Sequence, residues 1–135
     1  MGIFIPKRPF LERRFAYSGN PALSSLRETA VLTVQNGIPW WYFQKEAGAL
    51  GGTHLRSLDP KGTLSTAIAA DRIIGCVVYP AAALVEPGTV QHMAGHRFSL
   101  GELDGRRTER ANTISQAFSG AGFRSRVIPH IRSEI

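Results

Sequence analysis

The residues that most constrain the fold are Ala30-Val31-Leu32-Thr33-Val34, an uncharged run in which three of the five side chains are β-branched. Such a run is typical of a strand buried in a parallel sheet. It stops at Gln35-Asn36-Gly37, whose residue types favour a turn and whose amide groups can donate and accept hydrogen bonds. Pro39 prevents the strand from continuing. The sequence therefore predicts an amide side chain at the carboxyl end of a buried strand, where open α/β sheets bind ligands.

Further strands are predicted between residues 73 and 101. Residues 73–79 form a second apolar run and predict another buried strand. Residues 86–89 have the composition of a turn, and residues 89–92 alternate as a half-buried strand. Residues 97–101 alternate as well. Together these segments predict a mixed sheet with an antiparallel hairpin.

One well-defined helix is predicted after residue 103. Asp104-Gly105 is expected to open it, and Gly122 suits the position just after its end. Spacings of three and four residues predict one apolar face, formed by Ala111, Ile114, Ala117, Phe118 and Ala121. Residues 123–127 then alternate as a last strand, and a further helix is expected over residues 131–135. For residues 64–70 a helical turn and a strand remain alternatives.

Composition excludes several classes of protein. Of the 135 residues, 43% are hydrophobic and 19% are charged, which is typical of a globular chain. No apolar run approaches the ~20 residues of a membrane helix, and the N-terminus has no signal-peptide pattern. The net charge of +6 comes mostly from scattered arginines, without the basic stripe and exposed aromatics of a nucleic-acid binder. We therefore expect a cytoplasmic protein that binds neither membrane nor nucleic acid.

Four local features have a structural and a functional interpretation. The aromatic residues 40–43 favour core and dimer-interface packing over substrate stacking. His92 and His96 are four residues apart, but the hairpin pattern argues against a metal site. Cys76 lies in a predicted strand and is expected to be a small buried residue. The glycine-rich residues 48–52 are expected to form a loop and have the wrong spacing for a phosphate-binding motif.

Five motifs in order resemble the ketopantoate reductase family (2-dehydropantoate 2-reductases). They are VLTVQNGIPWWYF from residue 31, RIIGCVVYPAAALVEPGTVQH from residue 72, RFSLGELDG from residue 97, AGF from residue 121 and IRSEI from residue 131. The resemblance implies an α/β fold, namely the C-terminal half of a Rossmann-type NADP-binding domain with a mixed sheet, an antiparallel hairpin and one flanking helix. It assigns residues 30–129 to a partial cofactor domain and residues 130–135 to the start of an interdomain helix. Residues 1–29 are an unmatched N-terminal segment.

The resemblance also implies a function. The chain is expected to be a fragment of an NADP-dependent oxidoreductase that reduces the 2-oxo acid 2-dehydropantoate to pantoate, in pantothenate and coenzyme A biosynthesis. Asn36, Gly37 and Ala81 are the implied cofactor-binding residues, and Asn36 the implied substrate ligand. The family's catalytic lysine is expected beyond Ile135, and no Gly-x-Gly-x-x-Gly loop occurs in residues 1–135. The isolated chain is therefore expected to be inactive. Separately, no residue is expected to bind a metal ion.

Alternatives remain at each of these points. A non-catalytic Rossmann-derived binding or interaction domain is the alternative function, and the resemblance leaves a homodimer open. Asn36 could be a turn residue in the left-handed conformation beside glycine. Ala81 could equally be a small residue at a crowded turn.

Overall fold

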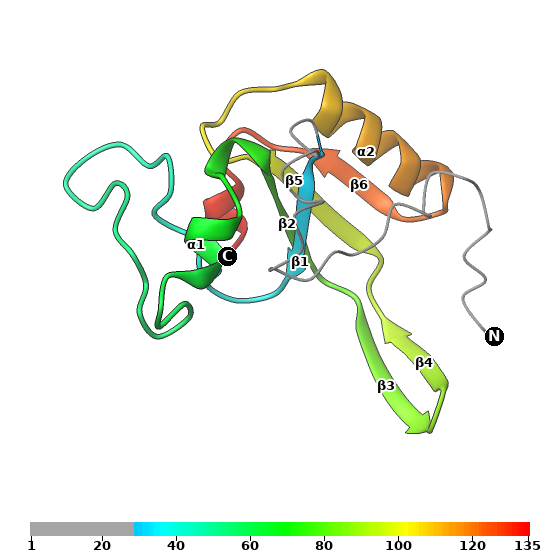
Figure 1. Cartoon of the computed structure of the whole chain (residues 1–135). Helices are drawn as coiled ribbons and strands as arrows, with labels where there is room; N and C mark the ends of the chain where they lie inside the picture. The colour runs from blue at the N-terminus through cyan, green and yellow to red at the C-terminus, as the bar shows by residue number, and fades with distance from the viewer. Residues whose placement is uncertain (1–28) are drawn as a thin grey trace.

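The computed structural model describes residues 29–135. The prediction that residues 1–29 form a separate unmatched segment lies outside the described residues, except for its last residue. Within the described range the fold is mixed α/β, with a four-stranded sheet, a hairpin and one main helix (Figure 1). That architecture confirms the predicted fold class at this level.

The sheet has the strand order β1-β2-β5-β6. β1 (Val31–Gln35) runs parallel to β2 (Ile73–Val78), with Val31 opposite Ile73. β5 (Arg97–Glu102) is antiparallel to β2, and β6 (Arg124–Val127) is parallel to β5. The predicted mixed sheet is therefore correct. Because β1 and β2 are parallel, their carboxyl ends lie at the same end of the sheet.

The helix α2 (Glu109–Gly120) packs on one face of the sheet (Figure 1). The core between them contains Ile74, Cys76, Leu100 and Ala111, all fully buried. Aromatic rings close one end of this layer, because Phe98 lies 4.9 Å from Phe118 and 4.8 Å from Phe123 between ring centroids. Cys76 is a small buried core residue, as predicted.

The predicted start of α2 was wrong, whereas its end was correct. Asp104 accepts a hydrogen bond from the backbone N–H of Arg106 at 3.1 Å, which makes a turn at the point where the helix was expected to open. The side chain of Thr108 caps the helix instead by accepting from the Ala111 N–H. At the other end Gly122 has φ 93°, and the N–H of Phe123 donates to the Phe118 carbonyl. These are the features of a Schellman motif.

The buried face of α2 is narrower than the apolar spacing predicted. Ala117 and Ala121 are exposed, and Ser115 is buried in their place. The hydroxyl of Ser115 donates to Ser125 Oγ at 3.0 Å, which satisfies its polar group against β6. Alanine is a favourable helix former even where its side chain is exposed and makes no contact. The apolar spacing therefore predicted a wider buried face than α2 has.

The other face of the sheet is covered by Trp41 and by the C-terminal 3₁₀ turn η4 (Ile131–Glu134). Two strand glycines let these groups approach. A Cβ atom on Gly75 would lie 2.7 Å from the Trp41 ring, and one on Gly101 would lie 2.8 Å from Ile131. Trp41 is 1% exposed and its indole N–H donates to Thr33 Oγ1 at 2.7 Å. The prediction of core packing is confirmed for Trp41.

The strands β3 (Ala81–Glu86) and β4 (Thr89–Ala94) form the predicted antiparallel hairpin but not the predicted burial. All twelve residues are exposed, because the hairpin projects away from the sheet (Figure 1). β1 is also less buried than predicted, and Val34 is 51% exposed. No described strand covers its outer side.

Residues between β1 and β2 form a long connection with little regular structure. It contains the short helix α1 (Thr63–Ala67), so the helical alternative is the correct one, and the 3₁₀ turn η3 (Ala70–Arg72). Asp59 holds α1 by accepting from the backbone N–H groups of Leu64 and Ser65 at 3.1 and 2.9 Å. Within residues 29–135 no helix has the length and apolar character needed to cross a membrane.

Candidate functional site

Asn36 lies where the parallel strands β1 and β2 end. It follows the last residue of β1, and its Nδ2 donates to the carbonyl of Val78, the last residue of β2, at 3.0 Å. The side chain is exposed. With Nδ2 engaged by the sheet, Oδ1 is the acceptor that Asn36 can present to a ligand. The predicted position at the carboxyl end of a strand is therefore confirmed.

Gly37 makes the turn that leaves this edge of the sheet open. Its φ of 114° lies in the region that favours glycine, and a Cβ atom there would meet nothing within 4 Å. Among the described non-glycine residues, only Lys45 has a positive φ. The alternative that Asn36 itself adopts the left-handed conformation is therefore wrong.

Ala81 lies at the same end of the sheet. It is the first residue of β3, three positions after Val78, and it pairs with Ala94 at the base of the hairpin. It is exposed, so the alternative that it fills a crowded turn does not hold. The three predicted residues Asn36, Gly37 and Ala81 thus lie around the carboxyl end of β2 and leave space rather than fill it.

A polar cluster that the sequence patterns did not reveal lies next to this edge. Tyr79 follows β2 directly, and its hydroxyl donates to Glu134 Oε2 at 2.8 Å. Ser99 Oγ donates to the same oxygen at 2.8 Å, and Arg126 Nη2 lies 2.9 Å from Oε1. The guanidinium of Arg97 lies 3.6 Å from the centroid of the Tyr79 ring and 3.5 Å from Glu134.

These contacts set the protonation states of the cluster. Burial raises the pKa of Glu134, but the hydroxyls of Tyr79 and Ser99 and the charges of Arg97 and Arg126 outweigh it, so the pKa is lowered overall. Burial, followed by the hydrogen bond to Glu134, raises the pKa of Tyr79. At neutral pH the cluster therefore holds a carboxylate and a neutral phenol. It fixes η4 to the sheet beside the strand ends.

The alternation of residues on β5 and β6 is the signal that could have indicated this cluster. Parallel partners share a face, so Ser99 and Arg126 lie on one side of the sheet. Their neighbours Phe98, Leu100 and Val127 lie on the other side, against α2. Both faces of this sheet are covered, so polar residues on the face opposite α2 predict a buried polar contact. They do not predict which residue makes that contact.

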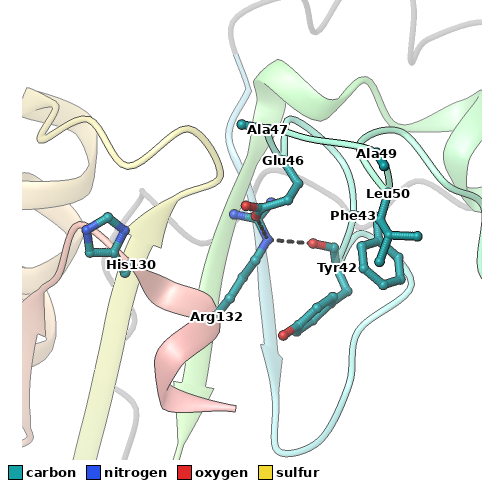
Figure 2. A pocket seen from close by; sticks show the side chains of 8 residues that line it. All are labelled: Tyr42, Phe43, Glu46, Ala47, Ala49, Leu50, His130 and Arg132. Atoms are coloured by element: carbon teal, nitrogen blue, oxygen red, sulfur yellow. Dashed lines mark hydrogen bonds and ion pairs between the residues drawn. The ribbon is translucent and has the colours of Figure 1, made fainter.

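A concave region with a volume of about 520 Å³ lies between η4 and the loop that follows β1, away from Asn36 (Figure 2). Its lining is mostly aromatic and apolar: Tyr42, Phe43, Ala47, Ala49 and Leu50, with Glu46, His130 and Arg132. Figure 2 shows Arg132 reaching from η4 to the loop that follows β1. The volume is within the usual range of ligand pockets.

The charge of Arg132 is not free to act on a ligand in this pocket. Its guanidinium donates to the carbonyls of Tyr42, Gln44 and Leu103. Its Nε also lies 2.9 Å from Glu46 Oε2. Arg132 therefore joins η4 to two loops. The glycine-rich residues 48–52 form the predicted loop and contribute Ala49 and Leu50 to the pocket wall.

His92, His96 and Cys76 do not form a shared catalytic or metal-binding group. His92 lies in β4 and His96 follows it, separated by Gly95 at φ 74°. Burial raises the pKa of Cys76 to about 12, so this thiol is not activated. Within residues 29–135 no three groups of His, Cys, Asp or Glu are placed to hold a metal ion.

Comparison with known proteins agrees with the fold. No family model matches the sequence. A 2-dehydropantoate 2-reductase of Mesorhizobium japonicum is 44% identical over 125 residues, which are 89% of this chain and 38% of that protein. A crystal structure assigned as a ketopantoate reductase of Ralstonia solanacearum MolK2 matches with a TM-score of 0.73 and 35% identity, over 83% of this chain and 37% of that one. A 2-dehydropantoate 2-reductase of Geobacter metallireducens GS-15 has a TM-score of 0.54 and 28% identity, over 76% and 29%.

The relatives that this chain matches are oxidoreductases by name, and the chain shares its mixed α/β fold with the Ralstonia structure. More particularly, the predicted resemblance to the ketopantoate reductase family is confirmed, for a segment that spans less than two fifths of the relatives it matches.

Proposed function

We propose that this chain forms part of an NADP-dependent 2-dehydropantoate 2-reductase. Residues 30–129 would be the C-terminal half of its Rossmann-type cofactor domain, and residues 130–135 would begin the interdomain helix. The observation that carries the proposal is the 44% identity over 125 residues with the reductase of Mesorhizobium japonicum. The agreement with the Ralstonia structure over 83% of the chain supports it.

The strand-end site suits the nicotinamide end of the cofactor. Asn36 presents Oδ1 to the edge of the sheet while its Nδ2 is held by the Val78 carbonyl. That oxygen can accept a hydrogen bond from a ribose hydroxyl, a carboxamide N–H or a substrate hydroxyl. Gly37 and Ala81 present little or no side chain there, which would let the cofactor approach the backbone closely.

NADPH bound at this edge would supply hydride to the ketone carbon of the 2-oxo acid. The residues of this chain would bind and orient the two reactants, because a hydrogen bond from a fixed amide restricts the approach geometry. The proton for the ketone oxygen is not assigned to any residue of this chain. We therefore expect the 135-residue chain alone not to reduce 2-dehydropantoate, and to bind NADPH weakly.

A chimera tests the proposal. The segment of the Mesorhizobium reductase that matches this chain is replaced by this chain's own residues, and NADPH oxidation that depends on 2-dehydropantoate is measured. The proposal predicts activity in the folded chimera. The second candidate, a non-catalytic binding or interaction domain, predicts a folded chimera that binds partners but has no such activity.

A further inference from the structure

The peptide group that joins Val78 to Tyr79, here called the strand-end peptide, holds the side chain of Asn36. Its carbonyl, which belongs to Val78, accepts from Asn36 Nδ2 at 3.0 Å. Its N–H, which belongs to Tyr79, donates to the carbonyl of Arg97 at 3.1 Å. A hydrogen bond to a carbonyl weakens steeply as its angles change. The orientation of this one peptide therefore decides where Asn36 Oδ1 points.

The strand-end peptide is the last one that the main sheet holds before the chain leaves it. Val78 is the last residue of β2, and its register partner on β5 is Phe98. Pro80 follows Tyr79 and has no N–H to donate, and β3 pairs only with β4. Backbone hydrogen bonds at the end of an element open more easily than those in its middle. A fixed orientation of Asn36 therefore needs a second anchor besides the sheet.

The side chain of Tyr79 supplies that anchor. It packs against the core cluster that contains Trp41 and Ile131, on the face of the sheet opposite α2. Its hydroxyl donates to Glu134 Oε2 at 2.8 Å and lies 3.1 Å from the backbone carbonyl oxygen of the same residue. The guanidinium of Arg97 covers the ring, 3.6 Å from its centroid. The ring is thus held by η4 at its hydroxyl and by β5 at its face.

Glu134 is itself held by the main sheet. Ser99 of β5, which is 0% exposed, donates to Oε2 at 2.8 Å. Arg126 of β6 donates to Oε1 at 2.9 Å. The carboxylate that accepts from Tyr79 is therefore fixed by two strands, and the phenol is tied to the sheet rather than to η4 alone.

We propose that Tyr79 is a positioning residue for the strand-end site. Held by Glu134 and Arg97, its side chain fixes the strand-end peptide. That peptide in turn holds Asn36 so that Oδ1 is presented to the ligand. The effect on reductase activity rests on the proposed function. The effect on Asn36 does not, because these contacts are made without a ligand.

Nuclear magnetic resonance of the Asn36 side-chain amide, in the isotope-labelled 135-residue chain, tests the positioning directly. The two Nδ2 protons are assigned by their loss in Asn36→Ala. Tyr79→Phe keeps the ring and removes the hydroxyl, so it should raise the solvent exchange rate of these protons at least about threefold. The matched control, Ser115→Ala, removes a buried hydroxyl that donates to Ser125 on the α2 face and should leave the rate unchanged.

A double-mutant cycle in the chimera tests what the positioning does for activity. Tyr79→Phe alone should lower kcat/KM for 2-dehydropantoate roughly 3- to 10-fold, because a misplaced amide orients the reactants less well. In a chimera that already carries Asn36→Ala, the same change should alter kcat/KM by less than about twofold. A merely structural role of Tyr79 predicts the same factor in both backgrounds. Ser115→Ala should leave kcat/KM within about twofold in both.

The exchange rate and the kinetics distinguish failure of this proposal from failure of the proposed function. An inactive chimera, or one in which Asn36→Ala has no effect, contradicts the proposed function, and the Asn36 amide still tests Tyr79. An exchange rate that is equal in wild type and Tyr79→Phe would overturn the proposal, as would effects of Tyr79→Phe and Asn36→Ala that simply multiply.

A second variant guards against a folding failure of Tyr79→Phe. Glu134→Gln weakens the same hydrogen bond from the acceptor side, so it should also raise the exchange rate of the Asn36 amide. The fluorescence of buried Trp41 reports that each variant is folded. A folded Glu134→Gln chain with an unchanged Asn36 amide would overturn the proposal as well.

Discussion

Replacing Glu134 tests whether the polar cluster fixes the C-terminal turn to the sheet. The carboxylate accepts from Tyr79 and Ser99 at 2.8 Å each, and its side chain is 15% exposed. A hydrogen bond to a charged group contributes about 1.5 kcal/mol or more when it is shielded from water. The pairs with Arg97 and Arg126 contribute little, because those side chains are 38% and 53% exposed.

We therefore expect Glu134→Ala to lower the free energy of unfolding by about 3 kcal/mol, and Glu134→Gln by about half as much, since the amide keeps one acceptor. Urea unfolding followed by the fluorescence of buried Trp41 measures both values. Glu109→Gln is the matched control, because Glu109 is an exposed carboxylate in the first turn of α2; its expected cost is about 0.5 kcal/mol.

The pH dependence follows from the lowered pKa of Glu134. A carboxyl group whose pKa is lower in the folded state stabilises the fold above its ordinary value of 4.5 and loses that contribution as the pH falls through the folded value. The wild-type chain should therefore lose more stability below pH 4.5 than Glu134→Gln does. A Glu134→Ala variant within about 0.5 kcal/mol of wild type, or equal acid sensitivity of both chains, would refute this account of the cluster.

Two further predictions concern packing and capping. Gly75→Ala should cost about 2 kcal/mol or more in urea unfolding, because the new Cβ would lie 2.7 Å from the Trp41 ring; an unchanged midpoint would contradict the packing described. Asp59→Ala should accelerate amide hydrogen exchange at Leu64 and Ser65 more than at β2, since both N–H groups lose their acceptor. Burial raises the pKa of Asp59, but the hydrogen bonds from Ser65 and Leu64 lower it to about 2, so wild type should keep this protection as the pH falls and lose it only near that value.

The strands and turns were predictable where the determinants are local. Residues 73–79 predicted β2 because an uncharged run rich in β-branched residues favours a buried strand. Gly122 predicted the end of α2 because glycine adopts the positive φ that a helix end often requires, and its φ in the structure is 93°. The start of α2 was missed because Asp104-Gly105 and Thr108 both have the chemistry of a helix start. The choice depends on Asp104 bonding to its own turn.

Burial and long-range contacts were not predictable to the same degree. Residues 89–92 alternate like a half-buried strand, yet the hairpin leaves the sheet and all of them are exposed. Tyr79 and Glu134 are 55 residues apart, and no local pattern links them. The position of Asn36 was predictable because it depends on where one strand ends, whereas the Glu134 cluster depends on three strands and η4 meeting in space.

The kcat/KM of the chimera for 2-dehydropantoate, measured with and without Asn36→Ala, tests the central claim most directly. The matched control is Gln116→Ala, which removes an exposed amide on α2. If Asn36 holds the cofactor or substrate through one hydrogen bond, Asn36→Ala lowers kcat/KM roughly 10- to 100-fold and Gln116→Ala leaves it unchanged. Equal activity of the two folded variants would contradict the assignment of the strand end as the reductase site.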